Sequence, residues 1–452
     1  MFKQIIKGTA FTSQSKTMVN SLVDVLFCIN EEGIIEKIIS PEEPNYQQVL
    51  VAAKSDGILK ELASSEYLLP GFIDLHVHAP QWPQAGLALD RPLHDWLNTY
   101  TFPLEAKYAD VEFAEKVYSH LVDRLLSLGT TTALYFATVH KEASVVLAKT
   151  CATKGQRGLV GKVVMDHPNE NPSYYRDAST EQALSDTEAF IQEVQELNQT
   201  TKQGVYPVVT PRFIPSCTDE ALQGLGQLAE KYDTHIQSHC SESDWEHQYA
   251  YNRYGKSDTE MLHSFGLLTD KSVMAHAGLL SDADMQQFAD TGAAVAHCPI
   301  SNAYFGNAVT RVKQLMDDYQ VKVGLGSDIS GGFSPSLYDN LKQAVISSRM
   351  LEDGVNPLLS AEQRGKAESR LSLNEVFYLA TVGGGEALSL PIGKLDVGYA
   401  FDAQIIDVTR FPFIEETDLD EVFQKSLYLT ESEDIKQVFV QGELVYSNKG
   451  AK

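Results

Sequence analysis

Two histidines stand two residues apart at the end of an apolar run near the start of the chain. The run reads FIDLHVH, and it ends with His76 and His78. Side chains two apart on a β-strand point to the same face, so both imidazoles can approach one metal ion. A chain with 12 histidines also produces such a pair by chance. A metal site therefore requires further ligands elsewhere in the sequence.

Three further residues, of types that can bind metals, stand at the ends of later apolar runs: His239, His276 and Asp328. Catalytic zinc takes three or four nitrogen or oxygen ligands from the protein and keeps one position open for water. His76 and His78 with one more histidine and a carboxylate would meet that requirement. A single histidine at a strand end is more often a core or surface residue, but several at successive strand ends favour a metal site.

Glu242 follows three residues after His239, in the segment HCSES. A water activated by a metal needs a base to take its proton during attack, and an acid to deliver that proton to the leaving group. One carboxylate beside the metal can serve both purposes. The alternative is an acid at a helix start, stabilised by the helix dipole, and Glu242 is able to fill both roles.

Other catalytic motifs are absent from the sequence. HIQSH has the histidine spacing of a helical zinc protease but lacks the glutamate, and AHCPISN is not the Pro-Cys-x-x-Cys segment of cytidine-type deaminases. The chain has no Gly-x-Ser-x-Gly elbow, phosphate-binding loop or Gly-x-Gly-x-x-Gly fingerprint. Its five cysteines form no Cys-x-x-Cys pair, which argues against a disulfide framework and a thiolate zinc site.

The elements that must position these residues form a regular pattern. Short apolar runs alternate with long helical stretches such as DVEFAEKVYSHLVDRLLSL, which is typical of a parallel β/α architecture. Eight such runs predict a (β/α)₈ barrel, whose chemistry lies at the carboxyl ends of its strands. The runs cover residues 72–78, 130–138, 159–166, 205–213, 235–239, 272–277, 293–299 and 321–328.

The two ends of the chain differ from this middle part. Residues 1–70 and 390–452 contain strand-like pieces such as LVDVLFCI and YAFDAQIIDV, and residues 1–70 show no long helical pattern. We therefore expect a small β-sandwich built from both termini and a barrel over residues 71–389. The segment 350–368 has the composition of a polar loop that leads into a helix.

Charge and hydropathy limit the partners. The formal net charge is −25 and no dense Lys/Arg cluster occurs, which argues against nucleic-acid binding and favours a small substrate that is not strongly anionic. No run approaches about 20 apolar residues, so a membrane span is not expected. The first residues, MFKQIIKGTAFTSQSKT, do not form a secretory signal. The expected location is the cytoplasm.

Five segments, in their order along the chain, resemble the amidohydrolase superfamily: PGFIDLHVH, SHCSES, MAHA, AHCPISNA and GLGSD. The fourth apolar run ends in TPRF, without the lysine that is carboxylated in binuclear members, so the resemblance implies one metal per chain. Within the superfamily, HVHAPQ, LHDWLNTYTFPLEAKY, GTTTALYFAT, VTPRFIPSCT and GLGSDISGG resemble the guanine deaminase family.

The resemblance implies hydrolysis of guanine to xanthine and ammonia by a zinc enzyme, as a homodimer. Imidazole and carboxylate ligands suit iron as well as zinc. For His276 the resemblance leaves two roles, ligand or hydrogen-bond partner of the bound water, and we favour the second. The implied metal ligands are His76, His78, His239 and Asp328. The implied catalytic residues are Glu242, Asp328 and His276, and the implied substrate-binding residues are Gln81, Arg212, Phe213, His239, Glu242 and Asp328.

The side chains that the resemblance places against the purine suit that ligand. Arg212 stays charged and donates, which fits the carbonyl at C6 of guanine, while Gln81 both donates and accepts. Phe213 can lie against the ring face. The structural alternatives are an arginine paired with one of the 61 acidic residues and a phenylalanine in the core.

Two other functions stay open at this stage. One is a mononuclear amidohydrolase that acts on a different aminated heterocycle, such as a triazine or an adenosine-like compound. The other is a non-catalytic scaffold, which is disfavoured because such proteins usually lose ligands, whereas this chain has the full set together with Glu242.

Overall fold

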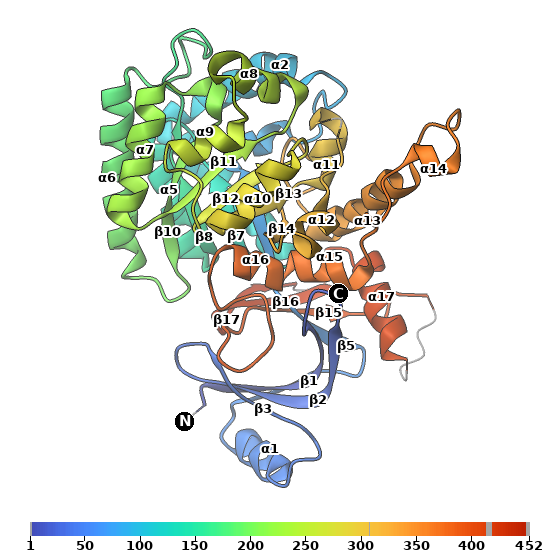
Figure 1. Cartoon of the computed structure of the whole chain (residues 1–452). Coiled ribbons are helices and arrows are strands. Elements are labelled where there is room, and N and C mark those ends of the chain that lie inside the picture. Colours follow the sequence, from blue (N-terminus) through green and yellow to red (C-terminus); the bar gives the residue numbers. More distant parts are fainter. Residues whose placement is uncertain (1, 307, 413–417, 449–452) are drawn as a thin grey trace.

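Eight parallel strands form the barrel that the sequence predicts, with helices between them (Figure 1). The computed structural model describes residues 2–306, 308–412 and 418–448. The strands pair in the order β14-β13-β12-β11-β10-β8-β7-β6, and the two-residue β9 (Val163–Val164) pairs with β10. Their bounds are β6 Phe72–His78, β7 Thr130–Phe136, β8 Arg157–Gly161, β10 Val205–Pro211, β11 His235–Cys240, β12 Ser272–His276, β13 Ala294–His297 and β14 Lys322–Leu325.

The barrel closes between its first and last strands. The backbone N–H of Asp328 donates to the carbonyl oxygen of His76 over 2.8 Å, and that of His78 donates to the carbonyl oxygen of Ile329 over 3.1 Å. Gly326 permits this approach, because a Cβ atom there would lie 2.8 Å from the Cβ of His76. The closure therefore brings the segment after β14 against the histidine pair of β6.

Helices cover the outside of the barrel (Figure 1). Several of these helices start with an N-cap residue. The side chain of Asp110 accepts from two backbone N–H groups at the start of α4, and Ser179 and Thr218 cap α6 and α7. Their apolar faces and the strands form one large core cluster. The main barrel helices are α4 Val111–Ser127, α5 Lys141–Lys154, α6 Thr180–Asn198, α7 Asp219–Tyr232, α8 Asp244–Tyr254, α9 Asp258–Ser264, α10 Asp282–Thr291, α12 Val312–Asp317, α13 Leu337–Asp353, α15 Leu373–Ala380 and α16 Val382–Ala387.

Short helical turns lie after the carboxyl ends of several strands. They are η1 Ala79–Gln84, α2 Leu93–Trp96, η2 Leu97–Thr101, α3 Phe102–Glu105, η3 Ala106–Ala109, η4 Ile214–Ser216, α11 Pro299–Ser301 and η5 Asn302–Gly306. Those between residues 79 and 109 follow β6 directly. They supply much of the wall around the site described below.

Strands from both termini form a second, eight-stranded sheet below the barrel in Figure 1. Its order is β17-β16-β15-β5-β1-β2-β3, with β4 paired to β1. Its halves enclose a separate apolar cluster that includes Phe27, Leu68, Phe401 and Phe439. The bounds are β1 Gln4–Ser13, β2 Val19–Ile29, β3 Ile35–Ile39, β4 Leu59–Glu61, β5 Glu66–Pro70, β15 Ala403–Asp407, β16 Ile435–Val440 and β17 Glu443–Ser447.

The structure differs from the sequence predictions in three places. The N-terminal segment contains a ten-residue helix, α1 (Tyr46–Ser55), which has only two buried side chains and hence a weak helical pattern. Helix α17 (Leu419–Leu429) interrupts the C-terminal strands, and residues 413–417 and 449–452 of that predicted unit lie outside the described residues. The segment 350–368 begins within α13, which continues to Asp353, and contains the short α14 (Ala361–Arg364).

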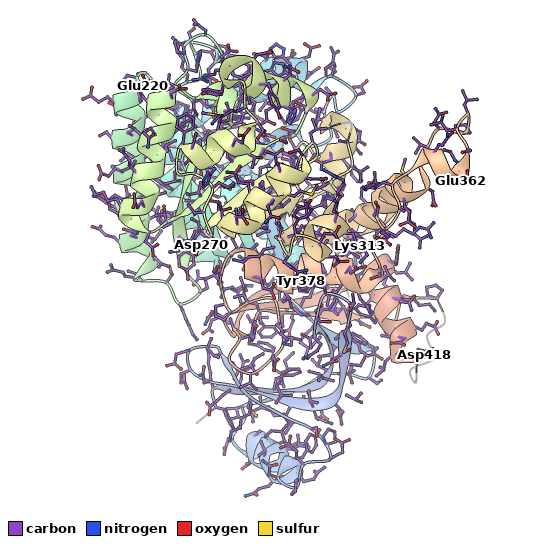
Figure 2. All side chains as sticks on the ribbon, in the orientation of Figure 1. Glu220, Asp270, Lys313, Glu362, Tyr378 and Asp418 are labelled. Carbon is purple, nitrogen blue, oxygen red and sulfur yellow. The ribbon has the colours of Figure 1, made fainter. Side chains whose placement is uncertain are left out.

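Acidic residues outnumber basic residues in this chain, 61 to 36. Figure 2 shows the exposed side chains of Glu220, Asp270, Glu362 and Asp418 projecting from different parts of the molecule. Within the described residues, no helix combines the length and the apolar character needed to span a bilayer.

Candidate active site

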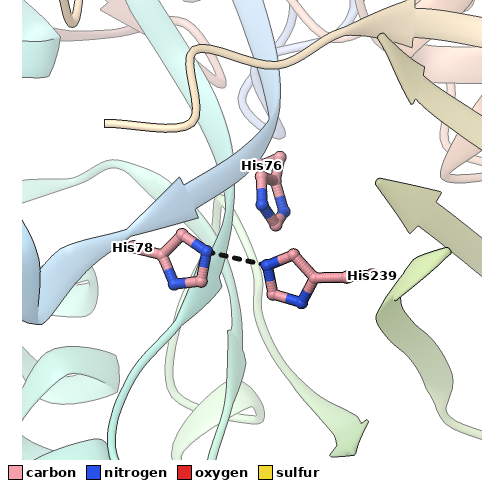
Figure 3. Close-up of side chains that lie close together, drawn as sticks. All are labelled: His76, His78 and His239. Atoms are coloured by element: carbon pink, nitrogen blue, oxygen red, sulfur yellow. Dashed lines mark hydrogen bonds between the residues drawn. The ribbon is translucent and has the colours of Figure 1, made fainter. Parts of the chain in front are cut away.

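Three imidazoles meet inside the barrel at the carboxyl ends of its strands (Figure 3). His76 and His78 come from β6 and His239 comes from β11. The Nε2 atoms of His78 and His239 are 3.0 Å apart, and the ring centre of His76 lies 4.8 Å from that of His78 and 4.9 Å from that of His239. All three side chains are buried. The structure thus brings together histidines that lie far apart in the chain.

Asp328 completes the cluster. Its Oδ1 lies 3.3 Å from Nε2 of His76 and 3.5 Å from Nε2 of His78. Asp328 stands three residues beyond the end of β14, not on the strand itself, and its φ of 47° lies in the left-handed region. This backbone conformation is uncommon for a residue other than glycine, and such conformations concentrate at functional sites.

The donor set fits a divalent metal ion. Burial, together with the neighbouring basic groups, holds the pKa values of His76, His78 and His239 well below the usual value, so the rings are neutral and carry a lone pair. Nδ1 of His239 donates to the carbonyl oxygen of Arg212 over 2.5 Å, which leaves its Nε2 free to bind a metal. Two ligands in a tetrahedral zinc site lie about 3.3 Å apart, close to the separations observed here.

Glu242 lies beside this cluster, with its Oε1 3.6 Å from Nε2 of His276. The residue precedes Ser243, which caps α8, and its backbone N–H donates to Oε2 of Glu246 over 2.8 Å. Burial and the nearby carboxylate of Asp328 raise the pKa of Glu242 to about 8. The carboxyl group can therefore hold or release a proton near neutral pH.

A chain of hydrogen bonds determines which nitrogen of His276 carries the proton. The hydroxyl of Thr310 donates to the carbonyl oxygen of His276 over 2.8 Å, so it accepts from Nδ2 of Asn302, which is 2.9 Å away. This arrangement turns Oδ1 of Asn302 toward Nδ1 of His276, at 2.9 Å. The proton therefore lies on Nδ1, and Nε2 presents a lone pair on the side where Glu242 lies.

A cavity opens beside the histidine and carboxylate cluster. His76 and His276 do not line the cavity, although both contact residues that do. All the side chains expected to bind the substrate line it: the polar Gln81, Arg212, His239, Glu242 and Asp328, and the apolar Phe213. Its apolar lining also contains Leu93, Trp96, Leu97 and Phe305, which were not expected from the sequence.

Two buried carboxylates behind the cavity were also missed. Glu105 accepts hydrogen bonds from Arg212 and Gln81. Oδ1 of Asp74 accepts from the backbone N–H groups of His76 and Ser327, over 3.2 and 2.9 Å, and so ties β6 to the segment that carries Asp328. Both residues lie within segments that carry the family resemblance, FPLE and FIDLHVH, which is the signal that could have identified them.

Comparison with known proteins extends over nearly the whole chain. The chain is 37% identical over 463 residues to the guanine deaminase of Dictyostelium discoideum, covering 98% of both proteins. It is 38% identical over 457 residues to the guanine deaminase of Rattus norvegicus, covering 98% of this chain and 96% of that one. The crystal structure of the guanine deaminase from C. acetobutylicum with guanine bound in the active site has 30% sequence identity and a TM-score of 0.87, covering 98% of this chain and 100% of the other.

The family assignment follows from a match to the amidohydrolase family over residues 67–445. This range includes all the strands of the barrel and all the side chains of the site. The chain belongs to the amidohydrolase family.

Proposed function

We propose that the protein is a zinc-dependent guanine deaminase, which converts guanine and water to xanthine and ammonia. The observation that carries this proposal is the composition of one cavity. Glu242, His239 and Asp328 line it together with Gln81 and Arg212. The two carboxylates and the histidine suit hydrolysis. Gln81 and Arg212 suit recognition of a heterocycle with a carbonyl group. The names of the relatives that match over nearly the full chain agree with this activity.

We propose His76, His78, His239 and Asp328 as the residues that would hold one metal ion per chain. Three neutral imidazoles and one carboxylate suit zinc, and they suit iron as well. When bound, such an ion lowers the pKa of a coordinated water to about 7 and so supplies a nucleophile at neutral pH.

Glu242 is the proposed proton carrier. Its carboxylate takes a proton from the attacking water and delivers it to N3 of the purine as the new bond forms between the water oxygen and C2. Glu242 then takes the proton of the new hydroxyl at C2 and delivers it to the amine, so that the C2–N bond breaks, ammonia leaves and C2 becomes a carbonyl. The raised pKa of Glu242, about 8, suits a group that must accept and donate in one cycle.

His276 and Asp328 orient the attacking water in this proposal. The lone pair on Nε2 of His276 accepts a hydrogen bond, because Asn302 holds the proton on Nδ1. Asp328 supplies a second acceptor from the opposite strand segment. Two acceptors at fixed positions direct the oxygen lone pair of the water toward the purine carbon.

The substrate would be held by its edge and its face. Arg212 donates to the carbonyl oxygen at C6, Gln81 hydrogen-bonds the same edge of the ring, and Phe213 packs against the ring. Phe213 is buried at the cavity wall, with its ring centre 6.1 Å from that of His239. A flat apolar wall beside a polar edge suits a planar base.

The direct test combines metal analysis with a substrate screen. Purified protein is analysed for zinc and iron, and ammonia release is measured with guanine, adenine and cytosine. We expect about one equivalent of metal per chain and release from guanine alone. Release from adenine in preference to guanine would contradict the proposed substrate. A metal-free protein with full activity would contradict the proposed mechanism.

We also propose that the enzyme acts in the cytoplasm as a homodimer on a small-molecule substrate, in purine catabolism and without nucleic-acid or membrane partners. All five cysteines are buried free thiols, which suits a reducing compartment. Exposed apolar side chains of α13 and the loop after it, including Met350, Val355 and Leu358, offer a surface for a second copy. Light scattering of the purified protein tests the dimer, and a monomeric mass would contradict it.

A further inference from the structure

Glu105 is a fully buried carboxylate at the end of α3, behind the cavity wall. Its Oε2 accepts from Nη1 of Arg212 over 2.6 Å, and its Oε1 accepts from Nη2 of Arg212 over 3.3 Å. Oε1 also accepts from Nε2 of Gln81 over 3.1 Å. One carboxylate thus holds both side chains that line the polar edge of the cavity.

The same short helix supports Arg212 in a second way. The guanidinium carbon of Arg212 lies 5.0 Å from the ring centre of Phe102, three residues before Glu105. Burial alone lowers the pKa of a guanidinium, but the charge and hydrogen bonds of Glu105 raise the pKa of Arg212 above its ordinary value. The pair therefore keeps the buried guanidinium of Arg212 charged and fixed.

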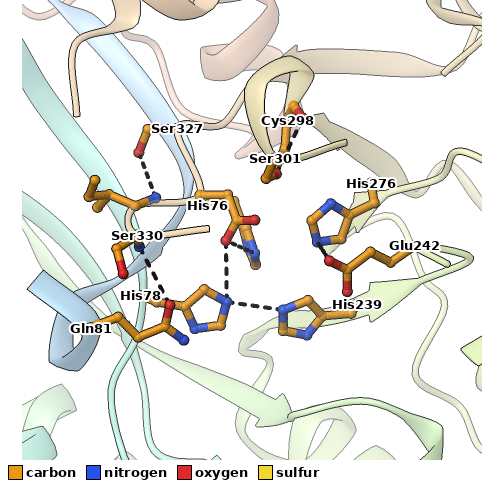
Figure 4. A network of polar contacts seen from close by, with 12 residues as sticks. His76, His78, Gln81, His239, Glu242, His276, Cys298, Ser301, Ser327 and Ser330 are labelled. Atoms are coloured by element: carbon orange, nitrogen blue, oxygen red, sulfur yellow. Dashed lines mark hydrogen bonds and ion pairs between the residues drawn. The ribbon is translucent and has the colours of Figure 1, made fainter. Parts of the chain in front are cut away.

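The orientation of the Gln81 amide follows from these contacts. The carboxylate of Glu105, paired with Arg212, accepts hydrogen bonds, so the amide nitrogen of Gln81 must face it. The amide oxygen of Gln81 is turned instead toward the backbone N–H of Ser330, 3.5 Å away (Figure 4). Nη1 of Arg212 directs its other N–H to Sδ of Met165, 3.7 Å away. Nη2 of Arg212 and Nε2 of Gln81 each carry a second N–H, so the edge near Glu105 has donors left for a ligand.

We propose that Glu105 is a positioning residue that sets purine specificity, because it holds Gln81 and Arg212 as two donors for a carbonyl group at C6. This inference rests on the proposed function and deepens it. An amine at C6 would place its N–H donors against the N–H donors of Gln81 and Arg212. These buried N–H groups would then have no acceptor. Sites built to hydrogen-bond one group reject analogues that lack it by large factors. The site therefore takes 6-oxopurines and rejects 6-aminopurines.

The test measures binding of two bases that carry no amine at C2. Hypoxanthine has the carbonyl at C6 and adenine has an amine there, and calorimetry gives both affinities for the metal-loaded protein. We expect the wild type to prefer hypoxanthine by at least 100-fold, and Glu105→Gln to reduce this preference to less than about tenfold. Equal binding of both bases by the wild type, or an unchanged preference in Glu105→Gln, would overturn the inference.

Asp402→Asn is the matched control. Asp402 forms a second buried ion pair, with Arg157 at the start of β8, so this variant also loses a buried carboxylate but leaves the cavity intact. We expect the control to lose thermal stability and to keep the wild-type preference. A control that lost the preference as fully as Glu105→Gln would assign the effect to general destabilisation and overturn the inference.

Glu105→Asp is a second variant, which keeps the inference testable if Glu105→Gln does not fold. It keeps the charge beside Arg212, but its side chain is one methylene shorter and cannot reach both partners. We expect its preference for hypoxanthine over adenine to be weaker than that of the wild type but above about tenfold. We also expect the KM for guanine to rise about 10-fold and kcat to change less than about threefold. A folded Glu105→Asp variant with wild-type preference and KM would overturn the inference. Absence of guanine turnover in a wild type that still prefers hypoxanthine would refute only the proposed function.

Discussion

Glu242 and His276 face each other beside the three clustered histidines, with 3.6 Å between Oε1 and Nε2, and both side chains are buried. We predict that Glu242→Gln lowers kcat about 10²- to 10⁴-fold, because the amide keeps the size of the side chain but cannot carry a proton. Steady-state kinetics with guanine measure this loss. Zinc content must match the wild type, and a metal-loaded variant with near wild-type turnover would exclude Glu242 as the proton carrier.

Asn302 provides the second prediction, because its amide oxygen holds the proton of His276 on Nδ1. Asn302→Leu keeps a side chain of similar size and removes that acceptor, so kcat should fall about tenfold with little change in KM. Asn302→Asp is the control, since it retains an oxygen facing Nδ1, and it should keep more activity than the leucine variant. Equal activity of the leucine variant and the wild type would show that the hydrogen bond does not orient His276.

The strands and most site residues could be predicted from the sequence because they obey local rules. Alternation along β6 puts His76 and His78 on one face, and the apolar runs are long enough to reveal the barrel. Asp328 was predicted at a strand end, but its position three residues beyond β14 depends on irregular backbone that no periodicity describes.

Glu105 and Asp74 were missed for a different reason. Glu105 acts through Arg212, which is 107 residues away in the chain, and Asp74 acts through the N–H group of Ser327, 253 residues away. A single buried carboxylate has no sequence pattern of its own, and its partners are known only from the tertiary contacts. Helix α1 was missed because only two of its side chains are buried. Helix α17 has buried Val422, Phe423 and Leu427 at helical spacing, a pattern that could have identified it.

Gly326 is the basis of the third prediction. A Cβ atom at this position would lie 2.8 Å from the Cβ of His76 and 2.9 Å from Sγ of Cys298. Gly326→Ala should therefore lower the free energy of unfolding by about 1–3 kcal/mol and displace His76, with a loss of bound metal. Thermal unfolding and metal analysis measure the two effects.

Gly278→Ala is the control for that substitution. A Cβ atom at Gly278 would make only ordinary contacts, 3.5 Å from the Cβ of Ala308 and 3.6 Å from the carbonyl oxygen of Ser241. We expect this variant to bind metal as the wild type does. Metal binding by Gly326→Ala at the wild-type level would contradict the claim that close packing at Gly326 places His76.

His297 supplies the last prediction, on the pH dependence of stability. Burial, with the nearby His276, lowers the pKa of His297 from 6.5 to about 3 in the folded protein. Between those values the unfolded chain binds a proton that the folded chain does not, so stability falls as the pH decreases, by up to about 1.4 kcal/mol per pH unit. His297→Gln cannot bind that proton, and its stability should depend less steeply on pH over this range. Urea unfolding of both proteins between pH 4 and 7 measures the difference, and identical slopes would show that His297 is already protonated in the folded state.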